Sequence, residues 1–484
     1  MWYNLVSSGC GSMLIVAYIL MLLSVIVFCM IYYYIFVMGT VSFYEFAYLL
    51  SHNFSAGGSL TVVFDTIFAC AGVFFVSGII IFLVCKFLLK NNKSKLIFSI
   101  VLLSLGVVCL IRTVHLDEYV INKSKNSDIF EKYYVDTNKV KIELPKNKRN
   151  LIIIYLESME ASLFSKENGG AFDKSIIPEL EKIAKDNLNI SNTNLLGGAY
   201  TLTSTSFTMS SITASTSGTP INIKLFKGYS KDRPFMKNVK SLGNVLKDNG
   251  YNLELIQGSD KEFGALDLYA LDNGGYKVFD NNTAKEKGLV DKNYFEWWGI
   301  EDKKVLEFSK NELIDLYNED KPFALVLFTM DTHFKDGYQD KTCESKYSEP
   351  LANSYACSSL MVSEYINWLK EQKFYDNTTI VLMGDHQVMQ DSFYKDHKDY
   401  DRVNYNAFIN SVKTGNNKNR KFSQYDMYPT ILASIGAKID GDKLGFGVNL
   451  FSNKKTLIEE LGKDYFNKEL LKSSKYYDKY IFSE

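Results

Sequence analysis

Apolar residues are distributed very unevenly along the chain, and this divides it into two parts. Residues 1–115 are overwhelmingly apolar, whereas nearly all of the charge follows them. The stretches 13–38 and 60–89 are each long enough to cross a bilayer core of ~30 Å at ~1.5 Å per residue, and residues 96–111 form a shorter third stretch. The pattern predicts three membrane-spanning helices within residues 1–115.

The first apolar stretch is expected to be retained as an anchor. It lacks a preceding basic segment, it is longer than the apolar part of a signal peptide, and no small-residue cleavage site follows it. Lysines crowd the connection between the second and third stretches, and positively charged connections stay in the cytoplasm. Everything after Thr113 is therefore expected to lie outside. These lysines are Lys86, Lys90, Lys93 and Lys95.

After residue 150 the pattern alternates apolar strands with amphipathic helices, which predicts an α/β domain with a largely parallel sheet. Predicted strands begin at Leu151, Leu253, Pro322 and Thr378, and predicted helices cover 178–187, 236–249 and 305–317. The predicted domains are a membrane domain at 1–115, a charged juxtamembrane connector at 116–149, an extracytoplasmic α/β domain at 150–455 and a C-terminal tail at 456–484.

Charge and cysteine usage narrow the class of protein. The net charge is −1, and no basic patch interleaved with aromatic residues occurs, so nucleic acid is not an expected partner. Five of the seven cysteines lie in or beside the apolar stretches, where they are expected to be packing residues. Cys343 and Cys357 would close a short loop outside the membrane, which favours a disulfide over two unpaired buried thiols.

Residues suited to metal binding follow two of the predicted strands. The run LIIIYLE ends at Glu157, and the run TTIVLMGDH ends at Asp385 and His386. The carboxyl ends of parallel strands open onto one crevice, so these side chains are expected to converge there. Two carboxylates and an imidazole typically bind a metal. A third strand runs into FTMDTH, which delivers Asp331 and His333 to the same edge.

A hydroxyl-rich run at 197–220 contains a candidate nucleophile. Residues 207–217 are predicted to form a short helix with Thr208 in its first turn. The unpaired N–H groups of a helix start favour a phosphate and an attacking alkoxide. Taken alone, such a run is more often a cap-rich loop, so this interpretation depends on the neighbouring metal set. Thr205 is the alternative nucleophile.

Six segments together resemble the lipoteichoic-acid-synthase-like branch of the alkaline phosphatase and sulfatase superfamily, particularly the membrane-bound phosphoglycerol transferases that act on periplasmic glucans. Their order and spacing are more specific than any single one. The resemblance implies an alkaline-phosphatase/sulfatase-like α/β fold. The segments are LIIIYLES at 151–158, FTMSSITASTSGTP at 207–220, WGIED at 298–302, TMDTHFKDGY at 329–338, MGDHQVM at 383–389 and YDMYPTILASIG at 425–436.

The resemblance also implies a mechanism. Thr208 would attack the phosphorus of a phospholipid head group, release diacylglycerol and hold the head group as a phosphothreonine ester, which an acceptor hydroxyl then displaces. His333 would lie beside the phosphate and move a proton. One divalent cation would assist, with Mn²⁺ expected and Mg²⁺ or Zn²⁺ as alternatives. The implied metal ligands are Glu157, Thr208, Asp385 and His386.

The residues expected to contact the substrate match the family less well than the metal ligands do. Gram-positive lipoteichoic acid synthases hold the glycerol phosphate with a His, a Trp and an Arg after the strand that here ends near Gln257, where this chain reads QGSDKEFGALD. The difference leaves Gln257, Asp260 and Lys261 as candidate head-group contacts, and places the chain closer to the glucan-modifying branch. Asp331 and Trp298 complete the predicted substrate contacts, with core packing as the alternative role of Trp298.

The expected protein is a multi-pass bacterial inner-membrane enzyme with its α/β domain in the periplasm or outside. It would transfer phosphoglycerol from phosphatidylglycerol to a periplasmic glycan or another envelope acceptor. A phosphoethanolamine transferase of the same superfamily is the alternative, and an inactive membrane-anchored binding protein is the second alternative. The C/S-x-P-x-R sequence of a true sulfatase does not occur.

Overall fold

The computed structural model describes residues 9–36, 41–52, 60–221, 228–389, 391–415 and 417–482. The chain forms two compact units, which are called the helical unit and the α/β unit below. The helical unit comprises residues 1–43, 58–121 and 389–391, and the α/β unit comprises residues 44–57, 122–388 and 392–484.

The helical unit contains three helices that are long and apolar enough to cross a membrane, as the sequence predicts for the part of the chain described. Helix α1 packs against both of the others. The Sγ atom of Cys85 lies 3.6 Å from Sδ of Met21, and a Cβ atom added to Gly106 would lie 3.3 Å from Val27, so α4 approaches α1 closely there. The protein is membrane-anchored. The helices are α1 (Gly9–Phe36), α3 (Leu60–Phe87) and α4 (Asn92–Thr113), followed by the short α5 (Leu116–Lys123).

A six-stranded sheet forms the centre of the α/β unit, and it confirms the predicted largely parallel arrangement. Only the edge strand β7 is antiparallel to its neighbour. All seven residues of β2 are buried, because this central strand has neighbours on both sides and helices over both faces. The order is β4 (Lys277–Phe279), β3 (Asn252–Ile256), β5 (Phe323–Phe328), β2 (Asn150–Leu156), β6 (Thr378–Gly384) and β7 (Asn406–Ile409).

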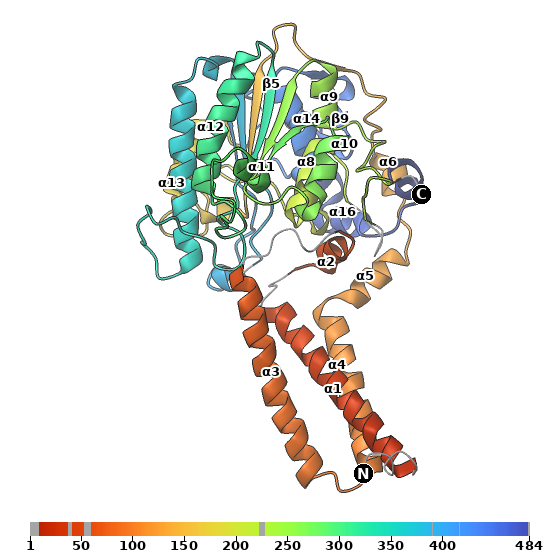
Figure 1. Ribbon diagram of the computed structural model, residues 1–484. Helices are drawn as coiled ribbons and strands as arrows, with labels where there is room; N and C mark the ends of the chain where they lie inside the picture. Colours follow the sequence, from red (N-terminus) through yellow and green to blue (C-terminus); the bar gives the residue numbers. More distant parts are fainter. Residues whose placement is uncertain are drawn as a thin grey trace. The chain divides into compact units, whose positions relative to one another are not determined.

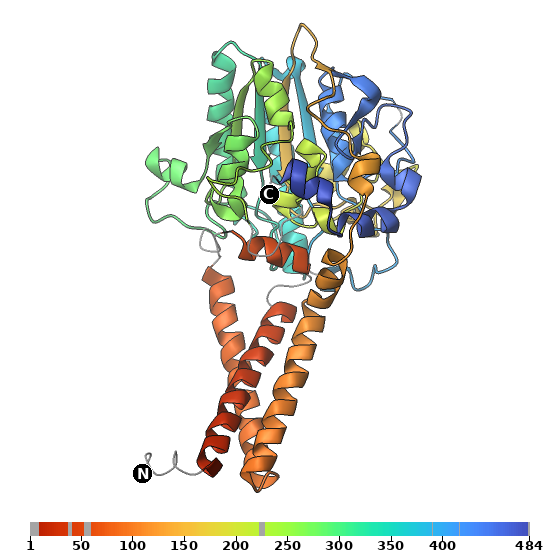
Figure 2. The same cartoon turned by 90° about the vertical axis from the view of Figure 1, so that its right-hand side faces the viewer.

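Helices cover both faces of the sheet (Figures 1 and 2). Figure 1 shows α12 and α13 on one side of the strands and α8, α9, α10 and α14 on the other. Helix α7 packs against α13, and α8 packs against α14. The bounds are α7 (Pro178–Asp186), α12 (Asp302–Asn318) and α13 (Pro350–Lys370), then α8 (Thr208–Ser217), α9 (Leu242–Asp248), α10 (Leu266–Asp272) and α14 (Gln424–Ser434).

Shorter elements complete the α/β unit. Strand β1 pairs with β8, and β9 pairs with β10, in two small antiparallel ladders. Residues 116–149, the predicted connector, contain α5, α6 and β1. The short elements are α2 (Phe43–Leu50), α6 (Ile129–Tyr133), α11 (Asn281–Glu286), α15 (Leu457–Leu461), α16 (Lys463–Leu470), β1 (Ile142–Glu143), β8 (Lys438–Ile439), β9 (Lys443–Leu444) and β10 (Gly447–Val448).

One predicted helix is shorter than expected. Helix α9 begins at Leu242 rather than at residue 236. Ser241 explains the start, because its hydroxyl accepts a hydrogen bond from the Asn244 amide at 3.3 Å while the Asn244 side chain accepts one from the Ser241 amide at 3.0 Å. This reciprocal capping box fixes the first turn. Met236 has a positive φ of 48°, which excludes it from the helix.

Candidate active site

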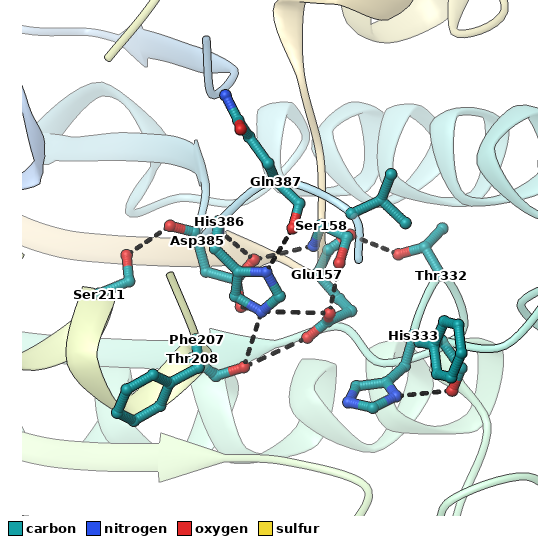
Figure 3. A network of polar contacts seen from close by, with 12 residues as sticks. Glu157, Ser158, Phe207, Thr208, Ser211, Thr332, His333, Asp385, His386 and Gln387 are labelled. Atoms are coloured by element: carbon teal, nitrogen blue, oxygen red, sulfur yellow. Dashed lines mark hydrogen bonds and ion pairs between the residues drawn. The ribbon is translucent and has the colours of Figure 1, made fainter. Parts of the chain in front are cut away.

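The three predicted metal-binding side chains that follow β2 and β6 lie together in the structure (Figure 3). The strands are paired so that Leu156 lies opposite Gly384, and the residues that come next are Glu157 and Asp385. Glu157, Asp385 and His386 each offer one ligand atom within 4.8 Å of the others. All three side chains are buried. Parallel pairing in register therefore brings residues more than two hundred positions apart to one point.

His386 is oriented with one ring nitrogen toward the carboxylates. Its Nδ1 lies 2.8 Å from the Gln387 carbonyl, which can only accept a hydrogen bond, so Nδ1 carries the proton. Its Nε2 lies 3.5 Å from Oε1 of Glu157 and 3.4 Å from Oδ2 of Asp385. In the neutral ring this nitrogen has a free lone pair, which is the arrangement that metal-binding histidines show.

Neighbouring backbone and hydroxyl groups hold the two carboxylates. Oδ1 of Asp385 accepts hydrogen bonds from the Ser158 amide at 2.8 Å and the His386 amide at 2.7 Å, which leaves Oδ2 facing the His386 ring. Oε1 of Glu157 accepts one from the Ser158 hydroxyl at 2.7 Å. The Thr332 hydroxyl donates to the Glu157 carbonyl at 2.6 Å. The donor set of two carboxylates and one imidazole suits Mn²⁺, Mg²⁺ or Zn²⁺.

Thr208 is the first residue of α8, and its hydroxyl faces the same cluster (Figure 3). Its Oγ1 lies 3.4 Å from Oε2 of Glu157 and 3.4 Å from Nε2 of His386. Thr205, the alternative, is fully buried, and its hydroxyl both accepts from the Leu202 amide and donates to the Leu202 carbonyl. The structure thus brings Thr208 to the metal-binding residues and leaves Thr205 in a local turn.

The cluster concentrates negative charge that attracts a proton or a cation. Burial raises the pKa of Asp385, and the nearby charge of Glu157 raises it further. Burial by itself would lower the pKa of His386, but Asp385 and Glu157 raise it to about 9. Burial also opposes ionisation of Glu157, yet the charges of His333 and His386 and the Ser158 hydrogen bond lower its pKa overall.

His333 lies beside this cluster with a free ring nitrogen. Its Nδ1 is 2.9 Å from the Phe334 carbonyl, which leaves Nε2 available as a proton acceptor in the neutral ring. The ring centroid lies 4.4 Å from that of Trp298, and Trp298 lies 5.9 Å from Phe263. The buried Nε1 of Trp298 has no hydrogen-bond partner among the described residues. A buried orphan donor of this kind is suited to a ligand oxygen.

Two of the predicted substrate contacts make bonds inside the protein. Asp331 is buried, and its Oδ1 accepts from the Asp302 amide at 3.1 Å, while Asp302 accepts in return from the Asp331 amide at 3.1 Å. This reciprocal pair joins the end of β5 to the start of α12. The Gln257 side-chain amide donates to the Asp260 carbonyl at 3.0 Å within its own loop.

The sequence did not predict three residues that hold the backbone of Asp385 in place without contributing to the metal-binding cluster. The Asp385 carbonyl accepts hydrogen bonds from Ser211 on α8 at 2.5 Å, from Asn404 at 3.0 Å and from Gln424 on α14 at 2.8 Å. These bonds tie the end of β6 to both helices. No sequence signal marks them, because Ser, Asn and Gln in such positions are common in loops and helix starts.

The predicted disulfide is present. Cys343 and Cys357 are bonded, with Cα atoms 5.6 Å apart, so the segment after β5 is linked to α13. The other cysteines whose side chains are described, Cys29, Cys70, Cys85 and Cys109, are free thiols.

Comparison with known proteins identifies the family. Residues 149–437, more than half of the chain, match the sulfatase family. The chain belongs to this family. The matched region begins just before β2 and ends just before β8, so this sulfatase-family domain contains the whole metal-binding cluster and Thr208. The family lies within the alkaline phosphatase and sulfatase superfamily, whose members depend on a metal, and the donor set described above fits one.

Curated relatives of this sulfatase-family chain include phosphoglycerol transferases. Phosphoglycerol transferase I of Escherichia coli (strain SMS-3-5 / SECEC) is 29% identical over 297 residues, which cover 59% of this chain and 37% of the relative. The protein of the same name from Citrobacter koseri is 29% identical over 299 residues, covering 60% and 37%. The chain therefore matches little more than a third of the length of these relatives.

Solved structures confirm the predicted fold. The lipoteichoic acid synthase LtaP from Listeria monocytogenes has a TM-score of 0.50 at 18% identity, covering 65% of this chain and 80% of that one. The integral membrane phosphoethanolamine transferase EptA from Neisseria meningitidis has a TM-score of 0.50 at 12% identity, covering 87% and 84%. At these identities the likeness shows the fold alone.

Proposed function

We propose that this protein is a metal-dependent phosphotransferase that moves a phosphoglycerol group from phosphatidylglycerol to a glycan or another envelope acceptor. The observation that carries the proposal is the Thr208 hydroxyl, which lies 3.4 Å from both Glu157 and His386 at the start of α8. A binding protein has no need of a nucleophile beside a metal-binding cluster. The similarity to phosphoglycerol transferases supports the choice of donor.

The proposed metal ligands are Glu157, Asp385, His386 and Thr208. A divalent cation, with Mn²⁺ proposed and Mg²⁺ or Zn²⁺ as alternatives, supplies positive charge that lowers the pKa of the Thr208 hydroxyl and offsets charge on phosphoryl oxygens. The first N–H groups of α8 are unpaired within the helix and add partial positive charge at the same place.

The transfer proceeds in two balanced displacements. The Thr208 hydroxyl loses its proton and Oγ1 forms a bond to phosphorus, while the bond from phosphorus to the diacylglycerol oxygen breaks and that oxygen takes up the proton. An acceptor hydroxyl then loses its proton and forms a bond to phosphorus, while the bond from phosphorus to Oγ1 breaks and Thr208 takes up that proton. His333 is the proposed proton carrier, because its Nδ1 is bonded to the Phe334 carbonyl and its Nε2 is left to exchange a proton.

Trp298 is the proposed wall of the head-group pocket. Its buried Nε1 lacks a partner among the described residues, and its ring lies 4.4 Å from that of His333. A hydroxyl or phosphoryl oxygen of the donor would satisfy this donor group. Gln257 and Asp331 remain proposed contacts, each in competition with the internal hydrogen bonds that it makes.

The membrane helices give the enzyme access to its donor. A phospholipid stays in its leaflet, so an anchored domain meets it at a high effective concentration. The positive-inside rule supports a cytoplasmic location for the connection that contains Lys86, Lys90, Lys93 and Lys95. The proposed location is therefore the bacterial inner membrane, with the α/β unit in the periplasm or outside.

Intact mass of the full chain in lipid nanodiscs tests this function. The nanodiscs contain phosphatidylglycerol and phosphatidylethanolamine, and Mn²⁺ is added without an acceptor. The expected result is a phosphoglycerol increment on the wild-type chain and on Thr205→Ala, and no increment on Thr208→Ala. A phosphoethanolamine increment would instead support the alternative transferase. If no adduct forms and no diacylglycerol is released, the result contradicts the proposal and favours the inactive binding protein.

A further inference from the structure

Helix α2 lies in the sequence between the first two candidate spans, yet from Tyr44 onward it belongs to the α/β unit. Glu45, Ala47 and Tyr48 are 8%, 1% and 2% exposed, and Tyr48 is part of the main hydrophobic core of that unit. A segment that the sequence assigns to the membrane domain thus folds as part of the domain that holds the nucleophile.

Four contacts hold α2 and the two residues that follow it in place. The Tyr48 hydroxyl donates to the Gly264 carbonyl at 2.5 Å. Nδ1 of His52 donates to the Tyr48 carbonyl at 2.9 Å, and its Nε2 accepts from the Tyr229 amide at 2.9 Å. A Cβ atom added to Gly228 would lie 2.1 Å from the Ser51 carbonyl oxygen, so the two backbones touch. Only glycine permits this approach.

The inward face of α2 points toward the candidate active site. The Tyr48 ring centroid lies 5.0 Å from that of Phe207, the residue immediately before Thr208. Glu45 precedes Tyr48 by three positions, so both side chains lie on one face of the helix. Burial raises the pKa of Glu45 to about 8, and its carboxyl also interacts electrostatically with His386, Glu157 and Asp385.

Glu45 interacts electrostatically with the metal-binding residues but does not belong to their group. Of the described residues, only Glu157, Asp385 and His386 form the group whose ligand atoms fall within 4.8 Å of one another. A carboxyl group next to such a cluster, on the wall behind the nucleophile, is placed to bind a polar group of the substrate.

We propose that α2 forms a wall of the active site, in which Tyr48 positions the Phe207–Thr208 segment and Glu45 binds the hydroxyl groups of the donor head group. This inference rests on the function proposed above. Carboxyl oxygens accept hydrogen bonds from hydroxyls, and a buried acceptor discriminates strongly against a ligand that lacks the matching donor. The free hydroxyls of a phosphoglycerol head group provide such donors.

Steady-state kinetics of the full chain in nanodiscs tests the role of Glu45, with phosphatidylglycerol as the donor and Mn²⁺ present. Glu45→Gln is compared with Glu262→Gln, which makes the same change at an exposed residue two positions before Gly264. Glu45→Gln is expected to raise KM for phosphatidylglycerol about tenfold, the loss typical of one hydrogen bond, and to leave Mn²⁺ affinity unchanged. Glu262→Gln is expected to match the wild-type chain.

The positioning role of Tyr48 has its own readout. Tyr48→Phe keeps the ring and removes the hydroxyl that bonds Gly264, and Gly228→Ala displaces α2 without altering either side chain. Tyr48→Phe is expected to lower kcat while KM and Mn²⁺ affinity stay close to wild-type values, because it shifts the Phe207–Thr208 segment and leaves Glu157, Asp385 and His386 in place. Gly228→Ala is also expected to lower kcat, and to raise KM as well, because displacing α2 moves Glu45 with it. A general loss of folding would lower Mn²⁺ affinity as well.

Several results would overturn the inference. Wild-type KM in Glu45→Gln would remove the head-group role, and lost Mn²⁺ affinity in that variant would make Glu45 a metal ligand instead. A selective loss of phosphatidylethanolamine turnover would show that Glu45 binds an ammonium group. Unchanged kcat in Tyr48→Phe and Gly228→Ala would remove the positioning role. Activity that persists in Thr208→Ala would instead overturn the proposed function itself.

Discussion

Each metal-binding side chain is oriented by a hydrogen bond with a residue that lies next to it in the structure. The Gln387 carbonyl fixes the His386 ring, and the Ser158 amide and hydroxyl hold Asp385 and Glu157. These bonds leave Nε2 of His386, Oδ2 of Asp385 and Oε2 of Glu157 toward the cluster. Such supporting bonds set both the affinity and the geometry of a metal site.

Metal affinity is expected to increase with pH. The pKa of His386 is about 9, because Asp385 and Glu157 stabilise its charged form against the effect of burial. A proton on Nε2 competes with the cation, so raising the pH toward about 9 removes the competitor. Without a cation the sign is opposite, since the ion pairs stabilise the fold below the unfolded-state pKa and are lost above about 9. Calorimetric titration with Mn²⁺ in buffers of different ionisation enthalpy measures affinity and proton release, and an affinity that falls as pH rises would contradict the expectation.

Gly384 allows β6 to end where it does. A Cβ atom at this position would lie 1.8 Å from the Met159 carbonyl oxygen, so Gly384→Ala must shift the strand end that carries Asp385 and His386. Mn²⁺ affinity is expected to fall about 10- to 100-fold, as for other losses of metal-site support. Gly415→Ala is the control, because nothing lies within 4 Å of the added atom. Equal affinity of the two variants would show that the strand end adapts.

At the scale of elements, the segment that returns from β6 to β7 is anchored by one buried ion pair. Arg402 donates to both carboxylate oxygens of Glu160, at 2.8 and 2.5 Å, and Glu160 is fully buried. The Val388 amide donates to the same carboxylate at 3.1 Å. Glu160, four positions after β2, therefore fixes both ends of the segment that follows His386, at Val388 and at Arg402.

Removing only one partner of this ion pair is expected to destabilise the protein strongly. Arg402→Ala leaves the Glu160 carboxylate buried without its cation, and the free energy of unfolding should fall by about 3–5 kcal/mol. The double variant Arg402→Ala with Glu160→Gln should recover part of the loss, because the buried charge is gone. Denaturant unfolding of the full chain in nanodiscs compares them. Equal stability of the single and double variants would show that water reaches the carboxylate.

At the scale of the whole molecule, the chain joins apolar helices to a domain of a superfamily that acts on phosphate and sulfate esters. The first and second candidate spans are separated by a segment whose residues from Tyr44 belong to the α/β unit. Both the chain before the second span and the chain after the third thus contribute to one domain. Both segments must therefore lie on the same side of the membrane. The two candidate spans that separate them in the sequence, the second and the third, meet this requirement, because two crossings return the chain to the side on which it started.

Cysteine labelling checks this topology. In a chain whose free cysteines are replaced by alanine, Ser94→Cys lies in the lysine-rich connection and Ser345→Cys lies on the exposed surface of the α/β unit. A membrane-impermeant maleimide is expected to label Ser345→Cys in spheroplasts and Ser94→Cys only after lysis, because positive connections stay in the cytoplasm. The reverse pattern would contradict the assigned orientation.

The sequence by itself determined the three spans, the parallel sheet and the residues at the strand ends, since hydrophobic runs and their period report local structure and burial directly. It left Thr205 and Thr208 open, and it placed Glu45 and Tyr48 with the membrane helices. The tertiary structure shows that the Thr208 hydroxyl lies next to Glu157 and His386, and that α2 from Tyr44 onward belongs to the α/β unit. Whether a hydroxyl or a carboxyl reaches Glu157 and His386 depends on how α8 and α2 pack beside the ends of β2 and β6, and such contacts between distant segments leave no periodic mark in the chain.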